Sequence, residues 1–378
     1  MQVRYILPFL CFVMIAVQLS AQNIPIIAAT SDLVNVRDGK DFYENSWTIM
    51  PEYNPDVYES DKLGDWVVFY TDKDSIGFKI HPDSIYDFII LLNGKDSAYT
   101  RIQYAPSYLD ILKQAEAYNF EDHTAIPPFT YQDSSATELQ MLRKAFNLDS
   151  IAGGGNEISR ILNLLHWVHN IIPHDGNHEN PVVKNAMSMI AECKKDERGL
   201  NCRGLATVLN ECYLALGIRS RFVTCMPKDS VFNDCHVINM VYSNDLDKWI
   251  WIDPTNDAYI MDEKGTLLGL DEVRERLIKG EMLIVNPDAN WNHKASVVKE
   301  NYLFEYMAKN LYRFSCPLRS EYDYETLFKG KTRQYVELIP LDGYNQLPKI
   351  SNKTYETSGT SVTTYKTNNP NQFWVKPE

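Results

Sequence analysis

Basic residues are scarce in this chain relative to acidic ones. Its 378 residues include 37 Lys and Arg against 50 Asp and Glu, which gives a formal net charge of -13 at pH 7. Nucleic acids and anionic membrane surfaces bind proteins through basic patches. The composition therefore argues against a nucleic-acid partner and against binding to an anionic membrane surface.

Two motifs of cofactor chemistry are also missing. None of the seven cysteines has the Cys-x-x-Cys spacing of a zinc or redox site. The run Gly153–Gly155 lacks the Gly-Lys-Ser/Thr of a nucleotide loop, and the stretch Asn93–Ser97 lacks the upstream glycine of one. The sequence predicts no cofactor.

Long apolar runs are absent except for a short one at the N-terminus. Arg4 precedes the apolar stretch Ile6–Val17, and Leu19–Ala21 offers a small-residue cleavage site. The stretch is too short to span a membrane comfortably, and no second one follows. We therefore predict a signal peptide over 1–21 and a secreted or periplasmic protein without a membrane span. Removing Cys11 leaves six cysteines, too few for a disulfide scaffold in a chain of this size.

The remaining sequence divides by pattern into four parts. Residues 22–105 hold short aromatic and β-branched runs separated by turn signals, among them Asn93–Gly94, and are predicted to form an antiparallel β-domain. Residues 106–300 switch from helical to strand patterns and are predicted to form an α+β domain. A C-terminal helix and strands packed on this core are predicted over 301–350, and a polar tail over the Thr/Asn/Ser-rich residues 351–378.

A cysteine opens a well-marked helix in the stretch Gly199–Ile218. Apolar residues recur there every three or four positions, Asn201 is a good N-cap, and Gly217 suits a left-handed C-terminal cap. Cys202 then lies in the first turn, where free N–H groups and the helix dipole stabilise a thiolate. Taken alone, this feature fits a buried structural cysteine equally well.

Two strand patterns, 235–243 and 248–254, follow the helix. If a two-residue turn joins them, the residue opposite His236 is Asp253. If the turn is two residues longer, Thr255 lies opposite His236, and Asp253 is still a diagonal neighbour of His236. Side chains that face each other across two strands lie roughly 4.5–5.5 Å apart at Cβ. The sequence therefore predicts a His–Asp pair on adjacent strands.

This combination resembles the transglutaminase-like superfamily of papain-type cysteine enzymes. The resemblance rests on "LNCRGLATVLNECYLALGIRSRFVTC", "CHVINMVYS" and "KWIWIDPTNDAY", and it covers roughly Asn156 to Ile260. It implies an α+β fold in which the helix carrying Cys202 packs on an antiparallel sheet carrying His236 and Asp253. It also implies Cys202 as nucleophile, His236 as general base and then acid, and Asp253 as the carboxylate that orients the histidine.

Further residues are expected near the reacting groups. His174 and Asp175 are predicted as substrate contacts, and so is Asn201, which stands where many relatives have Gln or Asp. The backbone N–H of Cys202 at the helix N-terminus is predicted as an oxyanion donor, and no side-chain donor is identified.

A histidine-rich run is the rival cluster. His166 and His169 have the i, i+3 spacing that can share a metal. Pro173 ends that helix, however, and no acidic residue occupies a recognised ligand position. The sequence therefore predicts no metal site.

Two hypotheses for the function follow. The first is an exported enzyme that cleaves or transfers amide bonds, peptide or isopeptide, through a Cys-His-Asp triad and a thioester. Its partner would be a peptide or protein substrate, with cell-wall peptide as one class. Hydrolysis and transamidation share the first half of this reaction, and the sequence does not choose between them. The second hypothesis is a non-catalytic cell-envelope binding protein built on the same fold.

Overall fold

The computed structural model describes residues 24–229 and 234–378 and divides the chain after Pro106 into two compact units. The division lies one residue beyond the predicted boundary at 105. The predicted signal segment, 1–21, lies outside the described residues. Over the described ranges, no helix has the length and apolar character needed to cross a membrane.

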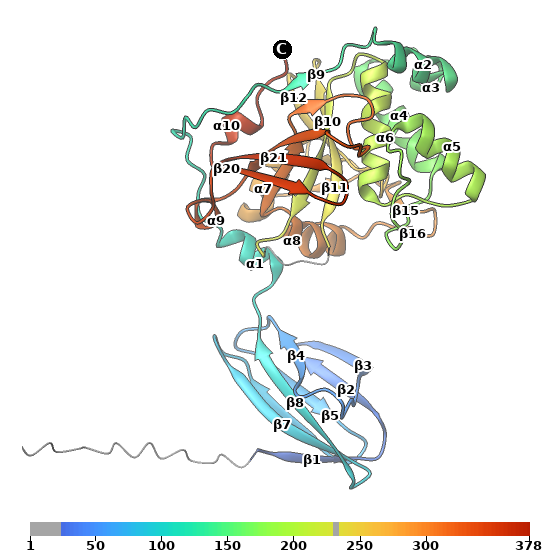
Figure 1. Ribbon diagram of the computed structural model, residues 1–378. Coiled ribbons are helices and arrows are strands. Elements are labelled where there is room, and N and C mark those ends of the chain that lie inside the picture. The colour runs from blue at the N-terminus through green and yellow to red at the C-terminus, as the bar shows by residue number, and fades with distance from the viewer. Residues whose placement is uncertain (1–23, 230–233) are drawn as a thin grey trace, which may run out of the picture. The chain divides into compact units, whose positions relative to one another are not determined.

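The first unit is a sandwich of two four-stranded sheets (Figure 1). One sheet has the order β1-β7-β8-β4, with strands β1 (Ile26–Ala29), β4 (Asp56–Ser60), β7 (Ile85–Leu92) and β8 (Asp96–Tyr104). The other has the order β3-β2-β5-β6, with strands β2 (Leu33–Asp38), β3 (Asp41–Thr48), β5 (Trp66–Tyr70) and β6 (Ser75–Lys79). Both sheets contribute to one apolar core, which contains the fully buried Val36, Phe69 and Phe88.

The prediction of an antiparallel β-domain is correct for only part of this unit. β1 pairs parallel with β7, and β4 pairs parallel with β8, so the first sheet is mixed. Asn93–Gly94 lies in the expected hairpin turn between β7 and β8, whose loop spans 93–95 because Leu92 pairs with Asp96, and both residues have positive φ (54° and 66°). The sequence does not mark β3 because nearly all its side chains are exposed, which leaves no alternation to detect.

A seven-stranded sheet runs through the second unit in the order β12-β11-β10-β17-β19-β21-β20. Its strands are β10 (Ser220–Met226), β11 (His236–Ser243), β12 (Lys248–Ile252), β17 (Arg313–Pro317), β19 (Thr332–Leu338), β20 (Ile350–Tyr355) and β21 (Thr360–Thr367). Only β19 and β21 pair in parallel. Three short pairs complete the strands: β9 (Thr130–Tyr131) with β18 (Arg319–Ser320), β13 (Ile260–Met261) with β14 (Ile284–Val285), and β15 (Asn290–Trp291) with β16 (Ala295–Ser296).

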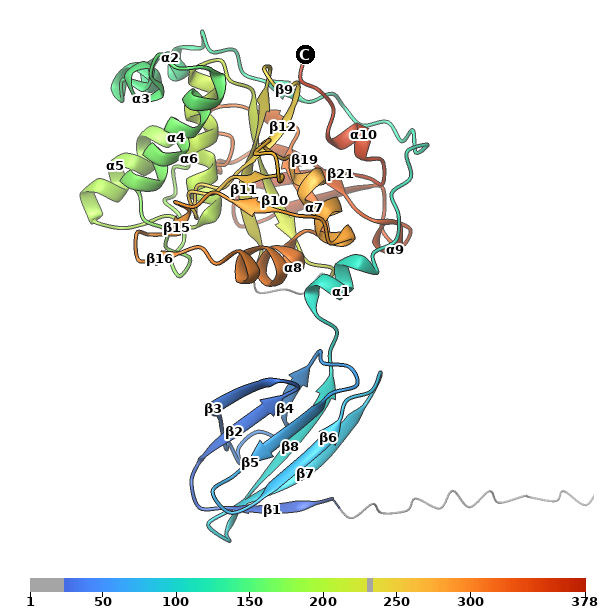
Figure 2. The ribbon, with the colours of Figure 1, turned by 180° about the vertical axis from the view of Figure 1, so that it is seen from behind.

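Helices cover both faces of this sheet where β10, β11 and β12 lie (Figures 1 and 2). One face is covered by α2 (Thr137–Ala145), α3 (Leu148–Ala152), α4 (Glu157–Ile171), α5 (Ala186–Asp196) and α6 (Cys202–Ala215). The other packs against α7 (Leu270–Lys279) and the π-helix η1 (Glu300–Met307), which continues into α8 (Ala308–Asn310). The other helices of the described residues are α1 (Tyr108–Lys113), α9 (Leu341–Tyr344) and α10 (Pro370–Phe373). The unit is thus a mixed α/β fold whose central strands are buried on both faces.

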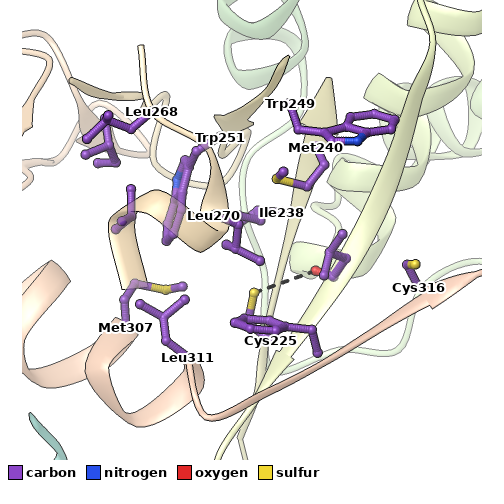
Figure 3. Packing of buried hydrophobic residues seen from close by; sticks show 14 of the residues in the cluster. Cys225, Ile238, Met240, Trp249, Trp251, Leu268, Leu270, Met307, Leu311 and Cys316 are labelled. Carbon is purple, nitrogen blue, oxygen red and sulfur yellow. Dashed lines mark hydrogen bonds between the residues drawn. The ribbon is translucent and has the colours of Figure 1, made fainter. Parts of the chain in front are cut away.

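The core on the second face is rich in large apolar side chains. Trp251 and Ile238 of the sheet pack with Leu270 of α7 and Met307 of the π-helix (Figure 3). Every residue of β10 and β11 is buried, which holds these strands in place on both sides. The backbone of His236, the first residue of β11, is therefore held in place by the packing of these buried strands.

The C-terminal residues are not the polar tail predicted over 351–378. They form most of β20, all of β21, and α10, and Phe373 of α10 is fully buried. The buried Arg221 donates from Nη2 to the carbonyl oxygen of Phe373 (2.9 Å), and Trp249 Nε1 donates to that of Trp374 (3.2 Å). The composition misled because threonine is β-branched and suits a strand as well as it suits a polar loop.

We expect Phe373→Ala to lower the free energy of unfolding by about 3–5 kcal/mol, because it removes a fully buried ring from the core. Urea denaturation followed by tryptophan fluorescence measures this loss. Val375→Ala, which shortens a largely exposed side chain two residues away, should change the value by less than about 0.5 kcal/mol. Equal small effects from both variants would place the C-terminal segment outside the core.

Candidate active site

Cys202 is the first residue of α6, as predicted. The side-chain oxygen of Asn201 accepts a hydrogen bond from the N–H of Gly204 (3.2 Å), and Gly217 follows the helix with φ of 74°. Asn180 holds this N-cap from outside, because its Nδ2 donates to Asn201 Oδ1 (2.7 Å) and its Oδ1 accepts from Asn201 N–H (3.0 Å). A Cβ at Gly204 would lie 2.6 Å from Asn180 Oδ1, so a larger residue there would displace the Asn180 amide from the N-cap. The side-chain oxygen of Asn201 thus fixes the helix start.

The antiparallel pairing of β11 with β12 brings His236 and Asp253 together. Ser243 faces Lys248, which makes Asp253 the diagonal neighbour of His236. The register with the two-residue turn is therefore wrong, and the register with the longer turn is confirmed. His236 Nε2 donates to Asp253 Oδ2 at 2.8 Å, and both side chains are buried.

Three further groups donate to the buried carboxylate of Asp253. Its Oδ2 also accepts from Tyr302 Oη (2.6 Å) and Asn256 Nδ2 (3.0 Å), and its Oδ1 accepts from the backbone N–H of Thr255 (2.9 Å). Burial alone would raise the pKa of Asp253, but the charge and hydrogen bond of His236, together with the hydrogen bonds of Tyr302 and Asn256, lower it to about 2. The carboxylate is therefore ionised at neutral pH.

Cys202 is partly exposed, and its thiol makes hydrogen bonds with the imidazole rings of His174 and His236. Burial raises its pKa, but hydrogen bonds from His174, His236 and the N–H of Val237 outweigh burial and lower it to about 6. Burial opposes the charge on His236, yet Asp253 and the sulfur raise the pKa of that imidazole to about 10. The site can therefore hold a thiolate beside an imidazolium at neutral pH.

The other described cysteines have the opposite character. All are unpaired, and burial raises the pKa of Cys193 and of Cys316 to about 11. Burial also raises the pKa of the remaining three, Cys212, Cys225 and Cys235. Among the cysteines that the structure describes, a lowered pKa is confined to Cys202.

Two cavities adjoin the reacting groups and share lining residues. The first, of about 610 Å³, is lined by Cys202 and Asn201 together with many charged side chains. The second, of about 550 Å³, is lined by His236 and by apolar and aromatic side chains that include Trp291. His174 and Tyr306 line both cavities. The reacting groups therefore lie between a polar and an apolar space.

The charges of the polar cavity neutralise one another. Glu325 is nearly fully buried, and its oxygens lie 3.3 Å from Arg203 Nη1 and 3.6 Å from Arg333 Nη1. Tyr335 Oη donates to it at 2.5 Å. Burial raises the pKa of Glu325, but the two arginines and Tyr335 bring it below the ordinary value, so the carboxylate stays charged.

Of the two predicted substrate contacts that follow Pro173, one lies at the site and the other does not. His174 reaches the site, but the carboxylate of Asp175 accepts hydrogen bonds within its own loop, from Asn177 N–H (3.1 Å) and His178 Nδ1 (2.7 Å). Asp175 is not among the residues that line either cavity.

The histidine pair with metal-ligand spacing does not share one position. His169 contacts the carbonyl oxygen of Pro254 (3.0 Å), whereas His166 Nδ1 lies 2.7 Å and 2.8 Å from the two oxygens of Asp257. Among the described residues, His166, Asp257 and Asp288 are the group that could hold a metal ion, with ligand atoms within 4.8 Å of one another. The hydrogen bond to Asp257 raises the pKa of His166.

Several residues of the site are missing from the sequence-based prediction. Tyr302 and Tyr306 lie one turn apart on the π-helix, and Tyr306 Oη is 3.4 Å from His236 Nδ1. Their i, i+4 spacing was a visible signal for a shared helix face, but nothing local connected it with Asp253. Asn256, three residues after Asp253, could have been found from its place in the turn.

Of the comparisons with known proteins, the match to a family model covers the position of this site. Residues 144–254, which include Cys202, His236 and Asp253, match the family model of the transglutaminase-like superfamily. No curated protein matches the sequence. Among solved structures, the chain is similar to a proposed cysteine protease from Cytophaga hutchinsonii, at 22% identity over 38% of this chain and 43% of that chain, with a TM-score of 0.25. It is also similar to red sea bream transglutaminase, at 13% identity over 66% and 52%, with a TM-score of 0.23. The chain spans less than two thirds of the length of either structure.

We expect iodoacetamide to alkylate Cys202 with a pH midpoint near 6, because the thiolate is the reactive form and protonation below that pH removes it. In His236→Ala the midpoint should move up toward about 8.5, the ordinary value for a thiol. Mass spectrometry of labelled peptides measures each cysteine separately, and the five others serve as internal controls. A wild-type midpoint at or above that of the variant would contradict the thiolate–imidazolium pair.

Proposed function

We propose that the transglutaminase-like domain of this chain is a cysteine-type enzyme that opens amide bonds by forming a thioester on Cys202. The observation that carries the proposal is the continuous contact from the Cys202 thiol to His236 and from His236 to the buried Asp253. Nucleophile, base and orienting group in hydrogen-bonding contact are the arrangement that covalent acyl transfer needs.

The first half of the reaction uses the groups as they stand. The Cys202 thiolate attacks the carbonyl carbon, a C–S bond forms, and the carbonyl electron pair moves onto oxygen. As that pair returns, the C–N bond breaks, and the leaving nitrogen takes a proton from His236. Nε2 of His236 is bonded to Asp253, so Nδ1 is the nitrogen that faces the sulfur and carries this proton. The products are a thioester on Cys202 and a free amine.

The second half regenerates the thiolate. Water or an amine attacks the thioester carbon, His236 accepts the proton of the nucleophile, and the C–S bond breaks. Water gives a carboxylic acid and an amine gives a new amide. The polar and apolar cavities beside the reacting groups offer separate places for the acyl chain and the acceptor. We propose a peptide or protein substrate, with cell-wall peptide as one class, encountered outside the cytoplasm.

The alternative is a binding protein that uses the same fold without chemistry. A binding function does not require a thiolate, whereas the contacts of Cys202 with two imidazoles stabilise one. The lowered pKa of Cys202 therefore favours the enzyme.

We expect Cys202→Ser to abolish amine release from a peptide library, a loss on the order of 10⁴-fold or more. The serine hydroxyl is not ionised beside His236 and is a far weaker nucleophile. Mass spectrometry of the products measures the loss. Parallel reactions with glycine ethyl ester distinguish hydrolysis from amine transfer, because the acid and amide products differ in mass.

The matched control is Cys193→Ala, at a cysteine on α5 away from both cavities. It should keep the activity, and both variants should melt within a few degrees of the wild type. Undiminished turnover in Cys202→Ser would place the nucleophile elsewhere, and a wild type without turnover on any amide would favour the binding protein.

A further inference from the structure

The backbone of His174 is held from two sides. The side chain of Asn292 accepts from the His174 N–H through Oδ1 (2.6 Å) and donates to the His174 carbonyl oxygen through Nδ2 (2.9 Å). On its other side, His174 forms a β-bridge with Leu200, two residues before Cys202. The position of His174 relative to the start of α6 is therefore fixed by backbone hydrogen bonds and not by side-chain packing alone.

The tautomer of the His174 ring is fixed by a neighbouring indole. Trp291 Nε1 lies 3.2 Å from His174 Nδ1. An indole N–H can only donate a hydrogen bond, so His174 Nδ1 must accept, and the neutral ring carries its proton on Nε2. The rings of His174 and Trp291 meet edge to face, with centroids 6.3 Å apart, which sets the orientation of the imidazole.

The protonated nitrogen of His174 is the one left to face the reacting groups. The ring makes a hydrogen bond with the sulfur of Cys202, and Nδ1 is already used by Trp291. His174 also lines both cavities that adjoin the reacting groups. An N–H group directed at a thiolate in the resting site is well placed to follow the charge when it moves to the carbonyl oxygen of a substrate.

His174 differs in its contacts from the histidine that acts as base. His236 is bonded to the carboxylate of Asp253, which stabilises its charged form. In place of a carboxylate, the ring of His174 meets the indole N–H of Trp291. A second proton on His174 Nδ1 would break the hydrogen bond from that N–H. No carboxylate hydrogen-bonds to its ring within the described residues. The surroundings of His174 thus favour a neutral donor over a base.

We propose that His174 is a catalytic oxyanion donor: its Nε2–H and the backbone N–H of Cys202 bind the carbonyl oxygen that becomes negative when the thiolate attacks. This inference rests on the proposed function. It supplies the side-chain donor that the sequence does not identify, and it gives Trp291 and Asn292 the role of positioning residues. Preorganised donors of this kind act by matching the charge that develops in the transition state.

Two probes of the same sulfur test the proposal. p-Nitrophenyl acetate acetylates the thiolate through a tetrahedral oxyanion and releases p-nitrophenolate, which leaves without needing a proton. Iodoacetamide alkylates the same thiolate by displacing iodide, and no oxyanion forms. Because both reactions consume one thiolate, the ratio of their rates cancels any change in its pKa. The ratio therefore reports stabilisation of the oxyanion alone.

We expect His174→Ala to lower the acylation-to-alkylation ratio about 100-fold, the effect of losing one oxyanion donor. His174→Gln, which keeps a side-chain N–H but cannot act as a base, should retain most of the ratio. Trp291→Phe leaves His174 in place but frees its tautomer, so the ratio should fall between these limits. His178→Ala, at an exposed histidine of the same loop, is the matched control and should leave the ratio unchanged.

The possible outcomes separate this inference from the proposed function. A wild type in which neither reagent prefers Cys202 would overturn both. A reactive wild type whose ratio is unchanged in His174→Ala would overturn the oxyanion role alone and leave the enzyme standing. Equal losses in His174→Ala and His174→Gln would show that a side-chain N–H at this position does not support acylation, and would also overturn the donor role. Alkylation that still prefers Cys202 over the other cysteines in each variant shows that the site is intact.

Discussion

The buried hydrogen bond between His236 and Asp253 is the interaction on which the rest of the site depends. Burying a carboxylate is costly unless it is paired and its oxygens accept hydrogen bonds. Here the carboxylate accepts from His236, from Tyr302 and Asn256 and from one backbone N–H, so each oxygen has a donor. These donors come from β11, from the turn after β12 and from the π-helix. The pair therefore joins three elements, and none of them can shift without exposing an unsatisfied charge.

The fold supports this pair with rigid elements on both sides. β10 and β11 are buried along their whole length, and α6 packs against both with nearly all of its side chains buried. A nucleophile at the start of a buried helix and a base at the start of a buried strand have little freedom, which favours a fixed geometry for chemistry. His174, which lies outside the helices and strands, reaches comparable order through Asn292, Trp291 and its bridge to Leu200.

The two cavities beside the reacting groups differ in chemical character. On the polar side, Glu325 is paired with Arg203 and Arg333. The charged residues that line this cavity balance, with Lys184, Arg203 and Arg333 against Glu179, Asp234 and Glu325, so the wall offers hydrogen-bonding groups and little net charge despite the acidic chain as a whole. On the apolar side, Trp291 and Tyr306 border the space next to His236. A thioester formed between these spaces would meet a polar partner from one direction and an apolar chain from the other.

Local features of the sequence were enough to determine the helix start at Cys202, its caps at Asn201 and Gly217, and the neighbourhood of His236 and Asp253, because caps and strand periodicity act over a few residues. The register between β11 and β12 needed the tertiary structure. Glu157 of α4 accepts hydrogen bonds from the turn, at Ser243, Asn244 and Asp245, and so stabilises the longer of the two possible turns. The C-terminal strands and the contacts of Tyr302, Trp291 and His174 were likewise decided by tertiary structure. Each depends on segments far apart in the chain, and no local pattern encodes which distant partner a side chain meets.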